Sequence, residues 1–400
     1  MKKSERRQQK TLYFDHAATS PITEIAYRAM IDACSSDIGN PGSVHGFGMK
    51  AMSIIDGSRE IFSDILGGEF GGTIFTSSAT EANNLALRGA VKKYTHRSGI
   101  SDAAFPARII ISGSEHDSVH NVAERMSQEG CEIVHLPTKK DGRTDLSHLD
   151  EAINGRTVMV SLIYVNNETG AVNDIKKAAK MISEYRGGGA YPLLHVDASQ
   201  AFRYYDCSFP FLGADMITLS SHKIGGPKGA GALCFRQENT LKMIEPIIIG
   251  GGQEFGMRSG TENVPAIAGF SAALNESFDI REKESRRLYE IKKIIAEGVV
   301  RIFPKAKING PSPEKGSPHI LNIWIPGKRA EDVLIAVDMA GGAISYGSAC
   351  SVRAFKPSRV LIDMGLSEDR VRESVRISLG RETTKGDAKG LLNIFKNLNI

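Results

Sequence analysis

Features that mark several protein classes are scarce in this sequence. No stretch approaches the roughly 18 apolar residues of a membrane helix. No apolar run follows the basic residues near the N-terminus, as one would in a secretory signal. The five cysteines are an odd number and none belongs to a C-x-x-C pair, so neither a disulfide framework nor a zinc site is indicated. We therefore expect a reduced, soluble, cytoplasmic protein without a membrane partner or a metal centre.

An excess of charge of one sign is also missing. Lysine and arginine total 50 residues against 46 aspartates and glutamates, for a net charge of +4. Composition thus gives no reason to expect a direct nucleic-acid partner. What the chain does have is length, because 400 residues with an apolar fraction of 41% exceed one ordinary domain and can fill sizeable cores.

Short apolar runs typical of strands alternate with helical patterns from residue 73 to residue 235. This alternation predicts an α/β domain with a mostly parallel central sheet flanked by helices. Near residue 264 the pattern changes to a long charged helix followed by shorter elements, which predicts a smaller α+β domain. We place the large domain at residues 20–262 and the small domain at residues 1–19 and 263–400.

Polar side chains follow four of the predicted strands directly. Because ligands of parallel sheets bind beyond the carboxyl ends of the strands, we expect these side chains to converge on one cofactor pocket. They are Glu115 with His116, residues 166–168, Asp197 with Gln200, and residues 220–223.

Lys223 stands at the mouth of one of these buried strands. Desolvation lowers the pKa of a lysine, and a neutral amine can form a Schiff base with a carbonyl group. The alternative is a solvated lysine that merely extends from a strand end. The glycine-rich runs at residues 225–231 and 250–256 lack the lysine spacing of a phosphate-binding P-loop, so we interpret them as tight turns.

Pyridoxal phosphate needs a lysine, a carboxylate beside its pyridine nitrogen and an anion site for its phosphate. Lys223 supplies the first. Asp197, at the end of the apolar run 193–196, supplies the second, since a buried carboxylate requires a cationic partner. The segment 77–84 joins a strand to a helix, and its N–H groups and hydroxyls suit a phosphate. Taken by itself, this segment has the pattern of a helix cap.

Several motifs occur in an order that resembles the cysteine desulfurases. These are pyridoxal-phosphate enzymes of fold type I in the class V aminotransferase-like family, and the match runs from about residue 13 to residue 381. The form of the last motif resembles the branch that includes the nitrogen-fixation and iron–sulfur housekeeping enzymes. The motifs are SATE at 78–81, EH at 115–116, VNNETG at 165–170, HVDA at 195–198, SHK at 221–223, GMRSGT at 256–261 and GSAC at 347–350.

The resemblance implies a role for each matching residue. Lys223 would bind the cofactor covalently, Asp197 would pair with the pyridinium nitrogen, and His116 would stack on the ring and transfer protons. Arg376 would bind the substrate carboxylate, which suits the planar fork of a guanidinium group. The remaining assignments are Gln200 at the phenolic oxygen; Ala79, Thr80, Ser220 and His222 at the phosphate; Thr261 at the phosphate of the neighbouring subunit; Asn167 at cofactor and substrate; and Asn40 near the substrate entrance.

The implied reaction converts L-cysteine to L-alanine and leaves a persulfide on Cys350. The sulfur would pass to an iron–sulfur scaffold protein or another thiolation acceptor, and the Thr261 role implies a homodimer. Cys350 has small neighbours, and Arg353 and Lys356 would favour its thiolate if they fold near it. Residues 351–356 are more basic and apolar than the Thr-Ser-rich loop of the family. The alternatives are a selenocysteine lyase, another class V aminotransferase-like enzyme, or a non-enzymatic pyridoxal-binding regulator or scaffold.

Overall fold

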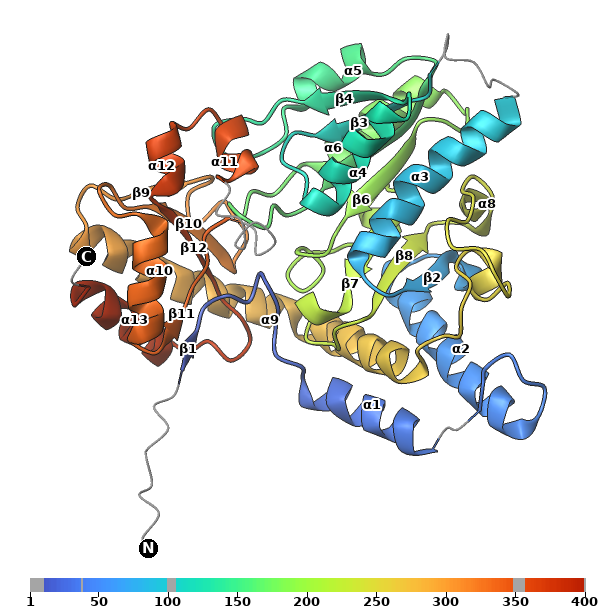
Figure 1. Cartoon of the computed structure of the whole chain (residues 1–400), viewed down its shortest axis with the longest axis horizontal. Coiled ribbons are helices and arrows are strands. Elements are labelled where there is room, and N and C mark those ends of the chain that lie inside the picture. The colour runs from blue at the N-terminus through green and yellow to red at the C-terminus, as the bar shows by residue number, and fades with distance from the viewer. Residues whose placement is uncertain (1–10, 37–38, 99–105, 348–356, 399–400) are drawn as a thin grey trace, which may run out of the picture. The chain divides into compact units, whose positions relative to one another are not determined.

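The structure, a computed structural model, describes residues 11–36, 39–98, 106–347 and 357–398 (Figure 1). The chain divides into a large unit, residues 19–166 and 172–283, and a small unit, residues 1–18, 167–171 and 284–400. The sequence placed the second boundary at residue 262. In the structure this boundary lies between Lys283 and Glu284, inside helix α9 (Val264–Ile302), which contributes residues to both units.

The large unit is built on a seven-stranded sheet in the order β2-β8-β7-β6-β5-β3-β4. Strand β8 pairs antiparallel with both of its neighbours, and the other pairs in this sheet are parallel. The predicted mostly parallel α/β sheet is therefore confirmed. The strands are β2 (Thr73–Thr76), β3 (Arg108–Ser112), β4 (Glu132–Leu136), β5 (Thr157–Ile163), β6 (Leu193–Asp197), β7 (Met216–Ser220) and β8 (Gly231–Phe235).

Helices cover both faces of this sheet. The connections β3–α4–β4 and β5–α6–β6 step across the sheet in opposite directions, so right-handed crossovers put α4 and α6 on opposite faces. Helix α3 packs beside α4 (Figure 1). The helices of the large unit are α1 (Glu24–Ser36), α2 (Gly46–Leu66), α3 (Ala79–Ser98), α4 (Asp117–Gln128), α5 (Leu149–Ala152), α6 (Ile175–Arg186), α7 (Phe209–Leu212), α8 (Glu238–Leu241) and the 3-10 turns η1 (Phe70–Gly72), η2 (Leu146–His148), η3 (Ser221–Lys223) and η4 (Glu254–Gly256), with the first part of α9.

An apolar core lies between α3, α4 and the sheet. Ile109 and Ile111 of β3 are fully buried, as are Ala82 and Ala86 of α3. Residues two apart on a strand share a face, and residues four apart on a helix lie one turn above each other. The apolar positions that predicted these elements from the sequence are therefore the ones that pack into the core. This core fixes the positions of the strand ends.

The small unit has an antiparallel sheet in the order β12-β10-β9 and a two-stranded parallel pair, β1 with β11. At one point its backbone needs glycine, since a Cβ on Gly380 would lie 2.1 Å from the ring of His16. The elements are β1 (Leu12–Tyr13), β9 (Lys307–Asn309), β10 (Ile320–Trp324), β11 (Gly342–Ala343), β12 (Ser374–Ser378), α10 (Ala330–Met339), α11 (Arg359–Asp363), α12 (Glu368–Arg372), α13 (Lys385–Lys396) and the remainder of α9.

Among the described residues, no helix combines the length and the apolar character needed to cross a membrane.

Candidate active site

The carboxyl ends of the parallel strands in the large unit carry most of the predicted site residues. Strand β6 ends at Asp197, β7 ends at Ser220, and Lys223 closes the 3-10 turn η3 that follows β7. Strand β3 leads to His116 and β2 to Thr80. Parallel strands bring these ends to one edge of the sheet, so the topology gathers these residues as expected.

Asp197 is a buried carboxylate, 3% exposed, that is held by neutral donors. The side-chain amide of Asn83 donates to its Oδ2 at 3.0 Å, and the backbone N–H of Ser199 donates to its Oδ1 at 2.9 Å. The same Asn83 amide also donates to Ser118 Oγ at 2.8 Å. Within the described residues, Asp197 forms no ion pair with a lysine or arginine. A buried carboxylate without a cationic partner favours a ligand that brings one.

His195 supports this strand end from within the sheet. Its ring lies 2.8 Å from Ser161 Oγ of β5 and 2.9 Å from Thr218 Oγ1 of β7, so it links three neighbouring strands. Burial lowers the pKa of His195 to about 4, although the charge of Asp197 opposes this shift. The imidazole is therefore neutral at physiological pH and adds no positive charge beside Asp197.

His116 is the N-cap of α4. The backbone N–H of Ser118 donates to its Nδ1 at 3.1 Å, and Ser118 Oγ lies 2.9 Å from the same nitrogen. Because Nδ1 accepts a hydrogen bond, the neutral ring carries its proton on Nε2. The cap thus fixes both the orientation and the tautomer of the ring that the resemblance assigns to proton transfer.

His222 precedes Lys223 in η3 and is held by the chain near the N-terminus of the large unit. Its Nδ1 lies 3.1 Å from Thr19 Oγ1, and its carbonyl accepts from the backbone N–H of Ser20 at 2.9 Å. Burial, reinforced by the positive charges of Lys223 and Lys228, lowers the pKa of His222 to about 4. A neutral His222 can donate one hydrogen bond to an anion without adding charge.

The junction between β2 and α3 is the candidate phosphate site. Ser78 Oγ accepts the backbone N–H of Glu81 at 3.2 Å, while Thr80 is exposed in the first helical turn. A Cβ on Gly231 would lie 2.4 Å from the Ser78 carbonyl carbon, so glycine is needed where β8 passes this turn. The first turn of a helix has N–H groups without intrahelical partners, which suit a phosphate.

Arg258 pairs with Glu81, the carboxylate in the first turn of α3. Its Nε donates to Glu81 Oε1 at 2.8 Å. Burial opposes ionisation of Glu81, but hydrogen bonds from Arg258 and Ser77 outweigh it and lower the pKa of the Glu81 carboxyl. A cavity of about 120 Å³ adjoins Ser77 and is also lined by Arg258 and by the exposed Thr261. Glu254 and Glu262 also line this cavity, and Glu254 pairs with the buried Arg59. Arg258 therefore brings a positive charge to a lining that is otherwise partly acidic.

The small unit holds Arg376, which is 1% exposed on β12. One guanidinium nitrogen donates to the Asn167 carbonyl at 2.9 Å, and another donates to Asp15 Oδ1 at 2.8 Å. The Nε atom of Arg376 is buried and has no hydrogen-bond partner within the described residues. This arginine already binds one carboxylate, that of Asp15, and its Nε is the donor that is left for another acceptor.

Of the other predicted residues, Asn40 and Gln200 belong to the large unit. Asn40 is exposed, and its side-chain oxygen accepts the backbone N–H of Gly42 at 2.9 Å, which makes a local turn. Gln200 is buried three residues after Asp197. Cys350 and the basic residues that follow it lie outside the described residues.

The sequence did not predict the residues that position the site residues through hydrogen bonds. Asn83 and Ser118 position Asp197 and His116, and Asp15 pairs with Arg376. The available signal was Asn83, an amide on the fully buried face of a helix where an apolar residue is expected. No comparable signal links Asp15 to a residue 361 positions away.

The large unit fits pyridoxal phosphate on observations of its own. Asp197 lacks a cationic partner among the described residues and can take the protonated ring nitrogen. Two buried polar atoms, Asn83 Oδ1 and Ser221 Oγ, have no hydrogen-bond partner within the described residues. Lys223, at the same edge of the sheet, would hold the aldehyde carbon, and the β2–α3 junction would hold the phosphate. Each part of the cofactor thus has a matching group in the large unit: Lys223 for the aldehyde, Asp197 for the ring nitrogen and the β2–α3 junction for the phosphate.

Comparisons with known proteins agree with this assignment. A family model described as Aminotransferase class-V matches residues 12–391. The chain is similar to cysteine desulfurase IscS 1 of Archaeoglobus fulgidus, with 38% identity over 383 residues that cover 96% of this chain and 95% of the relative. It is also similar to putative cysteine desulfurase IscS 1 of Bacillus subtilis, with 34% identity covering 97% and 99% of the two chains.

Solved structures give the same result. A structure titled NifS-like protein superposes with a TM-score of 0.87 at 27% identity and covers 96% of this chain and 98% of that chain. Another, titled SspA in complex with cysteine, has a TM-score of 0.78 at 30% identity and covers 92% and 98% of the two chains.

Proposed function

We propose, from the premise that this chain belongs to the class V aminotransferase family and is a pyridoxal-phosphate-dependent L-cysteine desulfurase, that Lys223, Asp197, His116 and Cys350 carry the reaction. The observation that supports these roles most strongly is the state of Asp197. It is a buried carboxylate with two neutral donors and no lysine or arginine partner within the described residues. A protonated pyridine ring supplies the missing cation.

The residues of the large unit divide the proton transfers between them. When bound, pyridoxal phosphate supplies an electron sink that stabilises negative charge on the substrate Cα. Lys223 would hold the cofactor in the resting enzyme, and its neutral amine would accept the Cα proton of the substrate. His116, with its proton on Nε2, would stack on the cofactor ring and donate that proton to the substrate.

In this proposal, Arg376 orients the substrate through its carboxylate. The guanidinium group is fixed by the Asn167 carbonyl and by Asp15, which leaves Nε as an unused donor. The substrate carboxylate would bind at Nε, while Asp15 competes for the charge of the same guanidinium group. The proposal also assigns Asn167, whose carbonyl binds Arg376, to contacts with cofactor and substrate.

Cys350 accepts the sulfur. Its thiolate attacks the substrate thiol sulfur, an S–S bond forms, and the substrate C–S bond breaks. The electron pair of that bond goes to the substrate β-carbon, which gains a proton, so the products are alanine and a Cys350 persulfide. Burial raises the pKa of the Cys131 and Cys234 thiols to about 12 and also raises that of Cys207. These three thiols are poor nucleophiles, which leaves Cys350 and the exposed Cys34 as candidates.

Mass spectrometry of the protein after one turnover with cysteine tests this role. We expect the peptide that contains Cys350 to gain one sulfur atom, with one alanine released per sulfur gained. Cys350→Ser should form neither alanine nor persulfide yet keep the yellow colour of the bound cofactor. Cys34→Ser, which removes another accessible thiol, is the matched control and should retain activity. Full release of sulfur by Cys350→Ser would favour the selenocysteine lyase or another enzyme of the family.

We also infer that the enzyme is a homodimer. A groove of about 690 Å³ runs between α1, α2 and α9 in the large unit, and Ile54, Ile61 and Ala272 line it. Ile25, which also lines the groove, and Tyr27 of the same helix are half exposed. Exposed apolar surface of this kind typifies a protein interface. Light scattering should give a dimer for the parent and a monomer for Ala272→Arg, whereas a fully active monomeric parent would contradict the inference.

Delivery of sulfur to an iron–sulfur scaffold protein is the downstream role that we infer, on the resemblance of residues 347–350. We place this role in the cytoplasm, where the free thiols found among the described cysteines are stable. Transfer of labelled sulfur from the loaded enzyme to a purified scaffold protein would support the inference. Release of the label only as free sulfide would contradict it.

A further inference from the structure

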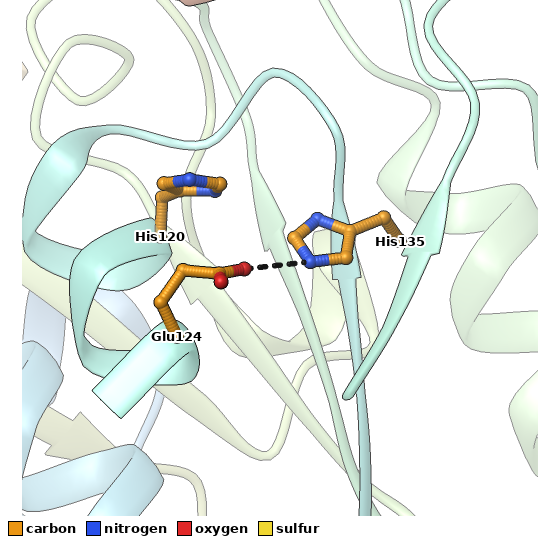
Figure 2. Close-up of side chains that lie close together, drawn as sticks. All are labelled: His120, Glu124 and His135. Atoms are coloured by element: carbon orange, nitrogen blue, oxygen red, sulfur yellow. Dashed lines mark hydrogen bonds and ion pairs between the residues drawn. The ribbon is translucent and has the colours of Figure 1, made fainter. Parts of the chain in front are cut away.

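Three side chains of the types that bind metals lie together at the edge of the large sheet, and none of them is assigned to the cofactor. They are His120 and Glu124 of α4 and His135 of β4, which Figure 2 shows side by side. Each offers one ligand atom, and the three atoms lie within 4.8 Å of one another. His135 Nε2 is 3.1 Å from Glu124 Oε1.

The fold brings these residues together from two elements. His120 and Glu124 are four residues apart on one helix and therefore share a face. Strand β4 is the last strand of the sheet, and α4 packs against it. The alternation of the strand turns His135 away from the buried Leu136 and toward the side chains of the helix (Figure 2).

The chemistry of the three groups selects a class of ion. Two imidazoles and one carboxylate suit Zn²⁺ and similar divalent transition metals rather than Ca²⁺ or Mg²⁺, which prefer oxygen ligands alone. Ligand atoms about 2.0–2.1 Å from a tetrahedral zinc are roughly 3.4 Å apart. Rotation of the exposed Glu124 and His135 side chains toward the half-buried His120 would close the present separation of at most 4.8 Å to that value. A water molecule can complete the tetrahedron.

The competing explanation is an ordinary surface pair between a histidine and a glutamate. The same unit contains one, in which His96 Nδ1 lies 2.9 Å from Glu245 Oε2 and the third neighbour of the carboxylate is Lys92. At the α4–β4 edge the third neighbour is instead a second imidazole, with its ring centroid 5.5 Å from that of His135. A pair between a histidine and a glutamate does not require a second imidazole. A metal site does, because that imidazole is its third ligand.

We propose that His120, Glu124 and His135 form a binding site for Zn²⁺ or a similar divalent transition metal, which joins helix α4 to the edge strand β4. The cysteine pattern of the sequence gave no sign of such a site, because its ligands are histidines and a glutamate. The site neither uses nor requires the residues that carry out desulfuration, so it stands apart from the proposed function. Its expected effect is structural, since a metal that binds only the folded state stabilises that state.

Titration calorimetry of the chelator-treated holoenzyme with zinc chloride tests the site. The background is Cys34→Ser with Cys350→Ser, because thiols are themselves zinc ligands. In this background we expect one zinc per chain, at least about tenfold weaker binding for His135→Gln or Glu124→Gln, and no change for the matched control His96→Gln. Zinc should raise the melting temperature of the background protein and not that of His135→Gln. Retained cofactor colour shows that each variant folds.

X-ray absorption at the zinc edge identifies the ligands directly. We expect metal–ligand distances of about 2.0–2.1 Å, from nitrogen and oxygen alone, in the background protein. Equal zinc affinity in the background protein and His135→Gln would overturn the proposal. So would equal weakening by His96→Gln, or a sulfur ligand near about 2.3 Å.

Discussion

Asp197 in the large unit and Arg376 in the small unit are both almost completely buried, and each carries a charge, but their charges are satisfied in opposite ways. Asp197 accepts hydrogen bonds from an amide and a backbone N–H, with no lysine or arginine partner among the described residues. Arg376 donates to a carbonyl and to the carboxylate of Asp15. One site therefore lacks its counter-charge, and the other has it.

This difference indicates what each site needs from a ligand. Removing a charge from water is costly unless a partner compensates, so the Asp197 site gains from a cationic ligand and remains incomplete without one. The Arg376 site already has its counter-charge in the protein, and a substrate carboxylate that binds Nε must share the guanidinium group with Asp15. We expect the first site to control cofactor chemistry strongly and the second to adjust substrate affinity.

The largest effect is expected from Asp197→Asn. The amide keeps the shape of the side chain but loses the charge that keeps the ring nitrogen protonated, so kcat should fall at least about a hundredfold. Steady-state assays of alanine formation measure this. The matched control is Asp215→Asn. Asp215 is an aspartate of the same unit that already pairs with Arg186, so the change should lower the melting temperature and leave the cofactor spectrum intact.

A smaller effect on affinity is expected from the two members of the small-unit pair. Arg376→Lys loses the planar fork and should raise the KM for cysteine about tenfold with a lesser change in kcat. Asp15→Asn removes the competing carboxylate and should lower that KM while it lowers the melting temperature. If Asp15→Asn instead raised KM as much as Arg376→Lys does, Asp15 would position the arginine rather than compete for it.

The strand ends of the large unit were predictable from the sequence, and the pairing in the small unit was not. Buried parallel strands appear as short apolar runs, so the polar residues after them, including Asp197 and Lys223, could be assigned to one edge before any coordinates. The Asp15–Arg376 contact depends on tertiary packing between residues 361 positions apart, for which one sequence carries no local pattern. The short elements β9 and α12 were missed, because three to five residues give too little periodicity.

The smallest effect concerns pH and stability. Burial lowers the pKa of both His195 and His222 to about 4 from the ordinary value of 6.5. As pH falls below 6.5, these two histidines become protonated in the unfolded chain. In the folded chain they stay neutral until about pH 4. The stability contributed by the neutral rings is therefore complete above that window and is lost as pH falls through it, by about 1.4 kcal/mol per pH unit and residue. Melting temperatures between neutral and mildly acidic pH should fall less steeply for His195→Gln, and parallel curves would contradict this assignment.

We propose above all that Asp197 keeps the ring nitrogen of the bound cofactor protonated. Nuclear magnetic resonance of the enzyme loaded with pyridoxal phosphate that carries ¹⁵N in the ring measures that protonation directly. We predict a protonated nitrogen in the parent at neutral pH and an unprotonated one in Asp197→Asn, with Asp215→Asn matching the parent. An unprotonated ring nitrogen in the parent, or a protonated one that persists in Asp197→Asn, would contradict the account.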